Sequence, residues 1–263
     1  MTLALDLPSL LRAADTAARA GGAIVAERLG PTGEARLKAP GDWVSEVDTN
    51  SEAAVRGVLE RDAPGLPVFG EEGGGSRGDI GWLVDPLDGT ANFLHGFPAV
   101  GVSVALVANG SPVVGVVHSP LLGDTYAACK GEGAFRNGEP IAVSARDQSL
   151  AICATGFPFR AKAERLDEYL PVFEAALRRF EDLRRAGSAS LDLAWTAAGV
   201  FDGYFEQALG PWDVAAGALL VREAGGIVTD WSGDDHAWLD SGDILAGPPA
   251  IHAALVELAR VRY

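Results

Sequence analysis

Cysteine, basic residues and long apolar runs are all scarce in this sequence. Only two cysteines, Cys129 and Cys153, occur among 263 residues, and neither belongs to a CxxC pair or has a histidine nearby in the chain. Both lie in apolar surroundings, so we expect buried, unreactive thiols. A chain of this length can bury enough surface to fold without disulfides, and free thiols are typical of a reducing compartment. A cytoplasmic location is therefore predicted.

The absence of long apolar runs excludes two kinds of segment. No run reaches the ~20 residues that a transmembrane helix needs. The N-terminus has neither the basic region nor the uninterrupted apolar core of a signal peptide. We therefore expect a soluble protein with no membrane partner.

The third shortage is positive charge. Lys and Arg together number 21, against 36 Asp and Glu, which gives a formal net charge of −15. Nucleic acids and anionic membranes are polyanions, so neither is expected as a main partner. An anionic small molecule would also be repelled by an acidic pocket unless bound cations reversed the local charge. The charge is therefore indirect support for bound metal ions.

Residues 1–147 are predicted to form an α+β half that contains an antiparallel sheet. Helical periodicity covers residues 7–28, a loop is expected over 38–47, and a second helix begins near Thr49–Glu52. The strands that follow are separated by hairpin signals such as Asn109–Gly110. These strands are expected at 66–69, 81–84, 100–107, 112–118, 125–129 and 134–135, and Gly30, Pro31 and Gly33 are expected to end the first helix.

Residues 148–263 are predicted to form an α/β half, because strands and helices alternate there and no flexible linker precedes them. This half is expected to complete a site begun by the first. Its strands are expected at 150–155, 201–205, 226–229 and 243–246, and its helices at 161–180, 192–200, 212–224 and 249–261.

The most informative motif is Asp85-Pro86-Leu87-Asp88-Gly89-Thr90, which directly follows a predicted strand. It places two carboxylates three residues apart on a turn, followed by backbone N–H groups that can face an anion. Carboxylates bind Mg²⁺, and an amide-rich turn that opens a helix binds phosphate. An ordinary turn is the alternative, since Asp-Pro and Asp-Gly both favour turns. An EF-hand is excluded, because Leu87 and Gly89 offer no side-chain oxygen at the loop positions that need one.

Further carboxylates occur at ends of strands or starts of helices. Glu71 follows a predicted strand, and Asp48 and Asp213 lie at the starts of helices. Each has a simpler interpretation: a solvated turn for Glu71, and helix caps for the two aspartates. Ends of strands are, however, where α/β proteins collect ligand groups. If these carboxylates converge with Asp85 and Asp88, cations are needed to offset their repulsion.

The segments Gly70–Glu72, Trp82–Phe93 and Pro211–Gly217 resemble the signatures of the inositol monophosphatase family. Arg184–Ala189 and Asp202–Glu206 also match in order and spacing. The resemblance extends over nearly the whole chain, with no departure at a metal position. It implies a layered αβαβα sandwich and a homodimer.

The resemblance also implies a metal site that holds two to three Mg²⁺ ions. Glu71, Asp85 and the Leu87 carbonyl would hold one ion, Asp85, Asp88 and Asp213 would hold a second, and a weaker third would lie near Glu71. Such ions can clamp the attacking and leaving oxygens of a displacement at phosphorus.

The remaining roles follow from the same resemblance. Asp48 and Thr90 would orient and deprotonate the attacking water, and Glu71 belongs to this catalytic set. Inhibition by Li⁺ is implied as well. The substrate, a small phosphate ester, would be contacted by Asp88, Gly89, Thr90, Gly187, Ser188, Ala189, Glu206 and Asp213.

Several alternatives to a myo-inositol monophosphatase remain. The same chemistry could act on histidinol phosphate, fructose 1,6-bisphosphate, NADP or an adenosine bisphosphate. A regulatory or binding protein could retain the fold without catalysis, and loss of a metal carboxylate would be its mark. A retaining glycosidase needs only two carboxylates and no metal set.

Overall fold

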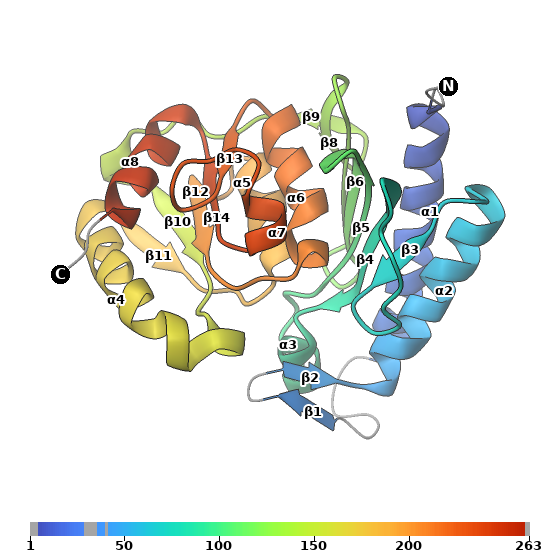
Figure 1. Cartoon of the computed structure of the whole chain (residues 1–263). Helices are drawn as coiled ribbons and strands as arrows, with labels where there is room; N and C mark the ends of the chain where they lie inside the picture. Colours follow the sequence, from blue (N-terminus) through green and yellow to red (C-terminus); the bar gives the residue numbers. More distant parts are fainter. Residues whose placement is uncertain (1–4, 29–35, 40–41, 261–263) are drawn as a thin grey trace.

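The computed structural model describes residues 5–28, 36–39 and 42–260. The elements form five layers: a helix pair, a large sheet, a second helix pair, a smaller sheet and a third helix pair (Figure 1). The predicted αβαβα sandwich is therefore confirmed.

The first helical layer consists of α1 (Leu7–Glu27) and α2 (Glu46–Asp62). Small and branched side chains on the inner face of α1 are buried, which lets the helix pack closely on α2 and on strand β6 (Ser111–Ser119) of the large sheet. The predicted start of α2 near Thr49 is one turn too late, because Ser45 caps the helix and Asp48 completes a capping box.

The large sheet is 7-stranded, in the order β3-β4-β5-β6-β7-β8-β9. Neighbouring strands are antiparallel, as predicted, apart from the parallel β3–β4 pair. The strands are β3 (Val68–Gly70), β4 (Ile80–Asp88), β5 (Gly101–Ala108), β6 (Ser111–Ser119), β7 (Asp124–Cys129), β8 (Gly133–Arg136) and β9 (Glu139–Ile141).

The second sheet is 5-stranded, in the order β11-β10-β12-β14-β13. It is mixed, because β10 pairs in parallel with β11 and β12 whereas β14 runs antiparallel to β12 and β13. The edge strand β11 was not predicted from the sequence. The strands are β10 (Ile152–Thr155), β11 (Asp182–Arg184), β12 (Gly203–Glu206), β13 (Ile227–Thr229) and β14 (Ile244–Gly247).

The helices α5 (Ala189–Ala197) and α6 (Pro211–Glu223) fill the space between the two sheets. Both are buried on nearly every side, in accord with their small and aliphatic residues. Close packing is required here: a Cβ added at Gly217 of α6 would lie 2.5 Å from the Cβ of Leu193 in α5.

The outer layer on the second sheet consists of α4 (Lys162–Arg179) and α8 (Pro249–Ala259). Short helices complete the fold: α3 (Thr90–His95), α7 (Trp238–Ser241), and the 3₁₀ turns η1 (Gln148–Leu150) and η2 (Phe159–Ala161).

Two sequence expectations need comment. The loop expected over 38–47 is wrong where it is described, because β1 (Arg36–Ala39) and β2 (Asp42–Val44) form a small antiparallel pair there. The expected helix end at Gly30, Pro31 and Gly33 lies outside the described residues.

Both cysteines are buried and unpaired, as predicted. Within residues 5–28, 36–39 and 42–260, every helix is too short or too polar to cross a bilayer.

Candidate active site

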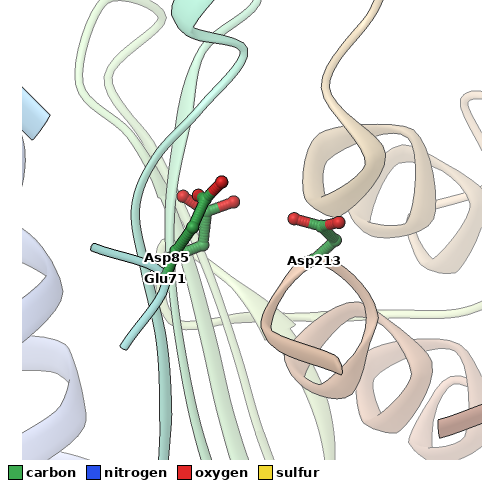
Figure 2. Close-up of side chains that lie close together, drawn as sticks. All are labelled: Glu71, Asp85 and Asp213. Atoms are coloured by element: carbon green, nitrogen blue, oxygen red, sulfur yellow. The ribbon is translucent and has the colours of Figure 1, made fainter. Parts of the chain in front are cut away.

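Glu71 and Asp85 are brought together by the parallel pair β3–β4. Gly70 is in register with Val84, and the Glu71 N–H donates to the Val84 carbonyl at 3.1 Å. Glu71 therefore leaves the end of β3 directly beside Asp85 in β4. The two carboxylates point into the same gap (Figure 2).

Glu52 of α2 holds the turn that carries Glu71. Its buried carboxylate accepts hydrogen bonds from the N–H groups of Glu72 and Gly73, at 2.8 and 2.9 Å, and from Arg56 at 2.7 Å. The sequence suggested only a helix-start position for Glu52. Its contacts with the turn depend on how α2 packs beside β3, so no local pattern in the sequence could predict them.

Asp213 approaches the same gap from the start of α6. Its Oδ2 accepts a hydrogen bond from the Gly210 N–H at 2.7 Å, so the residue is a helix cap, as its sequence position suggested. Ser103, which pairs with Asp85 across β4–β5, donates its hydroxyl to the Trp212 carbonyl at 2.9 Å. This bond fixes the first turn of α6 opposite Asp85, so Asp213 caps its helix and also joins the cluster.

The three carboxylates form a group suited to a metal ion. Glu71, Asp85 and Asp213 each offer an oxygen within 4.8 Å of the others. Burial, followed by the charges of Glu71 and the nearby aspartates, raises the pKa of Asp85 well above its ordinary value. Oxygen donors at such spacing fit a hard divalent cation such as Mg²⁺, which would also offset the repulsion between them.

Asp88 lies beside this group and is held by the start of α5. Its Oδ2 accepts the Ser188 hydroxyl at 2.7 Å, the Ser190 N–H at 2.7 Å and the Ser190 hydroxyl at 2.6 Å. Burial, together with the charge of Asp213, raises the pKa of Asp88 to about 6 despite these donors. Ser190 was missed from the sequence, and Ser188 is buried against Asp88, whereas Gly187 and Ala189 line the pocket.

Thr90 and Asp48 form the hydrogen-bonded pair that the resemblance implied. The Thr90 hydroxyl lies 2.8 Å from Asp48 Oδ1 and 3.1 Å from the Leu87 carbonyl. The other Asp48 oxygen accepts both the N–H and the hydroxyl of Ser45. Burial raises the pKa of Asp48 in spite of these donors, which makes it a stronger base than an exposed aspartate.

Gly89 supplies the turn before α3. Its φ of +94° is in the left-handed region, and an added Cβ would lie 2.9 Å from the Ala99 carbonyl. Asn92 of α3 donates its side-chain amide to the carbonyls of Ala99 and Ala186. The amide-rich turn and the Gly187 turn therefore face the same pocket from two sides.

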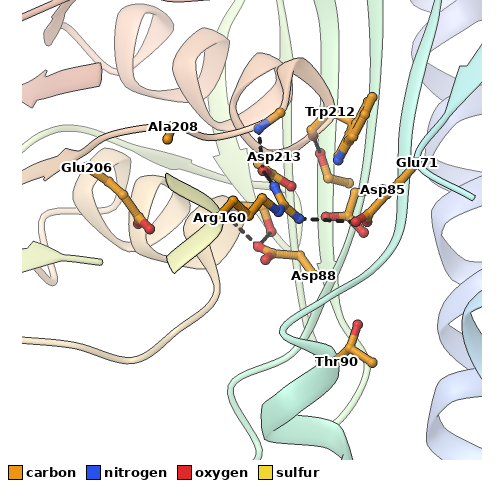
Figure 3. A network of polar contacts seen from close by, with 12 residues as sticks. Glu71, Asp85, Asp88, Thr90, Arg160, Glu206, Ala208, Trp212 and Asp213 are labelled. Carbon is orange, nitrogen blue, oxygen red and sulfur yellow. Dashed lines mark hydrogen bonds and ion pairs between the residues drawn. The ribbon is translucent and has the colours of Figure 1, made fainter. Parts of the chain in front are cut away.

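Glu206 lies across the pocket from the cluster, at the end of β12 (Figure 3). The Tyr204 hydroxyl donates to its Oε2 at 2.5 Å, and the carboxylate packs so closely on Gly156 that an added Cβ there would lie 2.0 Å away. Burial raises the pKa of Glu206 to about 8. A neutral acid at this place can donate a hydrogen bond to a hydroxyl as well as accept one.

Two charged residues of the site had no role assigned from the sequence. Arg160, in the 3₁₀ turn η2, donates to Asp213 at 2.7 Å and to Glu71 at 3.1 Å (Figure 3). Asp192 of α5 is buried, and among the described residues neither of its carboxylate oxygens has a hydrogen-bond partner. Burial, followed by the charges of Glu206 and Asp88, raises the pKa of Asp192 well above its ordinary value. None of the motifs in the sequence analysis included Arg160, and Asp192 resembles an ordinary acid in the first turn of a helix.

One pocket therefore collects almost all the residues singled out from the sequence. It is lined by Glu71, Asp85, Leu87, Asp88, Gly89, Thr90, Gly187, Ala189, Glu206 and Asp213, among others. Asp48 lies behind Thr90 and Ser188 behind Asp88.

Comparisons with known proteins agree with this geometry. The inositol monophosphatase family matches residues 6–262. The Nus factor SuhB of Escherichia coli (strain K12) is 41% identical over 253 residues, which cover 94% of this chain and 94% of that relative.

Solved structures are similar over the whole fold. The extragenic suppressor protein suhB of Bartonella henselae superposes with a TM-score of 0.90 at 35% identity, over 97% of this chain and 99% of that one. The inositol monophosphatase of Anabaena superposes with a TM-score of 0.85 at 34% identity, over 97% and 96% of the two chains.

Proposed function

Because the chain belongs to the inositol monophosphatase family, we propose that it is a Mg²⁺-dependent phosphomonoesterase that hydrolyses a small polyol phosphate, with myo-inositol monophosphate as the preferred substrate. The observation that carries this proposal is the meeting of Glu71, Asp85 and Asp213, from three separate segments, within 4.8 Å of one another. Bringing these charges together costs free energy, which a bound divalent cation would offset.

The metal ligands proposed are Glu71, Asp85, the Leu87 carbonyl, Asp88 and Asp213. When bound there, two to three Mg²⁺ ions would neutralise phosphate charge and lower the pKa of the attacking water. The protein's own part is to hold these oxygens in place, through the β3–β4 register, the Asp213 cap and the serines on Asp88.

The proposed proton acceptor is the Thr90–Asp48 pair. A water beside the Thr90 hydroxyl gives its proton to that oxygen while the hydroxyl passes its own to Asp48, 2.8 Å away. The raised pKa of Asp48 favours this transfer. The N–H groups of Gly89 and Thr90 at the start of α3 are proposed to bind the phosphate oxygens.

The polyol would occupy the side of the pocket formed by Glu206, Gly187 and Ala189. Glu206 and the backbone turn offer hydrogen bonds to hydroxyl groups, which supports a polyol over an apolar alcohol. Histidinol phosphate, fructose 1,6-bisphosphate, NADP and an adenosine bisphosphate are the competing substrates of the same chemistry.

The test is phosphate release from a panel of these esters with Mg²⁺ and with EDTA. We expect the highest kcat/KM for myo-inositol monophosphate and no release in EDTA. Release independent of Mg²⁺ from every ester, or no release at all, would contradict the proposal. A lithium titration of the same reaction tests the implied inhibition.

Asp88→Asn tests the role of the metal ligands directly. We expect kcat/KM to fall at least about a hundredfold, since even outer-shell partners of metal ligands contribute that much, while the melting temperature changes little. Asp62→Asn is the matched control, because it makes the same change on an exposed aspartate paired with Arg61. Equal activity of the two variants would remove Asp88 from the site.

A homodimer and a cytoplasmic location remain part of the proposal. The dimer is supported by two exposed apolar side chains, Phe97 and Leu122, which line one surface hollow together with Trp195 and Phe201. Light scattering of the purified chain measures its mass in solution. The location rests on the free thiols.

A second candidate comes from the name of the Escherichia coli relative, Nus factor SuhB. It would make this chain a binding partner in the transcription machinery, and the net charge of −15 favours contact with protein over nucleic acid. Binding to bacterial RNA polymerase, measured for the intact chain and for Asp88→Asn, tests it. Binding that survives in the inactive variant would show that the two roles are separate.

A further inference from the structure

The guanidinium of Arg160 spans two members of the carboxylate cluster. One nitrogen donates to Asp213 Oδ2 at 2.7 Å and another to Glu71 Oε1 at 3.1 Å (Figure 3). These are two of the three residues whose oxygens form the candidate metal group. A positive side chain and a metal ion would therefore use the same ligands.

Asp213 Oδ2, the oxygen closest to Arg160, already accepts as many hydrogen bonds as it has lone pairs. Asp213 Oδ2 accepts from the Gly210 N–H and from Arg160, both at 2.7 Å. A carboxylate oxygen offers about two lone-pair sites, and these two donors use both. Coordination of a cation by this oxygen requires that one donor leave, and the Gly210 N–H is fixed by the first turn of α6.

Arg160 is the most exposed of the three residues that form these two ion pairs. Its side chain is 36% exposed, whereas those of Glu71 and Asp213 are 11% and 4% exposed. It lies in the three-residue turn η2, which is outside both main sheets, and it lines the pocket. Rotation of a long side chain toward solvent needs no change in the backbone.

We propose that Arg160 is a tethered counter-cation that competes with the divalent metal for Glu71 and Asp213. In the metal-free protein it offsets part of the repulsion between the carboxylates and keeps them assembled. Metal binding displaces it, so its presence lowers the apparent affinity for Mg²⁺. The inference rests on the proposed function in one respect, namely that this cluster binds Mg²⁺.

Calorimetric titration of the metal-free chain with MgCl₂ tests the competition. If Arg160 occupies the cluster in about nine molecules of ten, its removal tightens the apparent Kd about tenfold. Arg160→Gln should show this gain. Arg160→Lys, which keeps the charge but loses the two-pronged geometry, should fall between that variant and the unmodified chain.

Arg165→Gln is the matched control. Arg165 lies in the next turn of chain, is also 36% exposed, and pairs with Glu168 and Asp243, outside the cluster. The Arg165→Gln substitution removes the same charge as Arg160→Gln, so it measures the general effect of making the protein more acidic. We expect its Kd to change less than about twofold, because its charge lies outside the cluster and is screened by solvent.

A second readout separates competition from a purely structural role. In EDTA, Arg160→Gln should melt at a lower temperature than the unmodified chain, because the carboxylates lose their counter-charge. In saturating Mg²⁺ the two should melt at the same temperature. A structural role would instead lower both melting temperatures equally.

The outcomes distinguish the two proposals. If the unmodified chain binds Mg²⁺ and Arg160→Gln binds it equally or more weakly, the competition is refuted and the proposed function stands. If none of the proteins binds Mg²⁺, both are refuted. If Arg160→Gln binds Mg²⁺ more tightly than the unmodified chain and Arg165→Gln do, the result supports both the competition and the proposed function.

Discussion

At the scale of single residues, the site contains acids whose protonation is set by burial. Glu206 is one example: its half-buried carboxylate packs against Gly156 and accepts the Tyr204 hydroxyl at the end of a strand of the second sheet. The Tyr204 hydroxyl stabilises its charged form, yet burial dominates and raises its pKa to about 8. At neutral pH without ligands this residue is therefore largely a neutral acid.

This pKa predicts how the stability of the metal-free chain depends on pH. Between the ordinary glutamate value of 4.5 and about 8, folded Glu206 retains a proton that the unfolded chain has released. The folded state then binds more protons, so this group stabilises the fold at low pH and the contribution is lost as pH rises through about 8. Glu206→Gln is neutral at every pH and lacks this loss.

The measurement is the melting temperature in EDTA from pH 5 to pH 9. We expect the difference between Glu206→Gln and the unmodified chain to grow in favour of the variant as pH rises. The two proteins share every other titrating group, so the effects of those groups cancel in the difference between the melting temperatures. A difference that stays constant over this range would contradict a raised pKa for Glu206.

At the scale of elements, the site is assembled where strands end and helices begin. The β3–β4 register places Glu71 beside Asp85, and the first turn of α6 carries Asp213 toward them. Glu52 connects α2 to the turn after β3 through two backbone N–H groups. Its effect on Glu71 is therefore indirect, through the path of the backbone.

Glu52→Ala is predicted to lower both stability and metal affinity. It leaves two backbone N–H groups without their acceptor, while the half-buried Arg56 keeps only the carbonyls of Val68 and Gly74. Removing one partner of a buried ion pair costs about 3–5 kcal/mol. Urea unfolding measures the first effect and calorimetric Mg²⁺ titration the second.

Asp15→Ala is the control for that change. Asp15 and Arg19 also form an i,i+4 ion pair on a helix, but both are exposed. We expect a loss below about 1 kcal/mol and no change in metal affinity. If the two variants lost equal free energy of unfolding, the contacts of Glu52 with the turn would contribute no more than an exposed ion pair does.

At the scale of the whole molecule, the middle helical layer joins the two sheets. α6 packs on the large sheet and on α5, while α5 also packs on the smaller sheet. Asp213 faces Glu71 and Asp85 because the first turn of α6 is bonded to β5 of the large sheet through Ser103. The division at residues 147 and 148 remains a prediction, since the middle layer buries helices of the second part against the first sheet.

Two glycine substitutions in helices test how closely this layer is packed. Gly217→Ala would place a Cβ 2.5 Å from that of Leu193, so we expect a loss of about 1–3 kcal/mol from overpacking. Gly57→Ala in α2 meets nothing within 4 Å, so we expect a gain of about 0.5–1 kcal/mol from helix propensity. Urea unfolding measures both. If both substitutions changed the free energy of unfolding in the same direction, the close approach of α5 and α6 would be contradicted.

The strand and helix pattern of this chain could be predicted from local signals, because hairpin turns and helical periodicity act over a few residues. The ends of elements were less certain. α2 begins one turn before its predicted start, since Ser45 and Asp48 form the cap. The strands β1, β2, β9 and β11 were not predicted, because strands of three or four residues leave no clear pattern.

By itself the sequence indicated most acids of the candidate site, because their motifs occur together in an order that resembles one family, but it gave no sign of Asp192. Only the tertiary structure decided what surrounds each acid. Ser103 faces Asp85, Ser190 binds Asp88, Glu52 holds the turn of Glu71, and Arg160 enters the cluster. These contacts join residues far apart in the chain, and their strength depends on distance and burial, which exist only once the layers have packed.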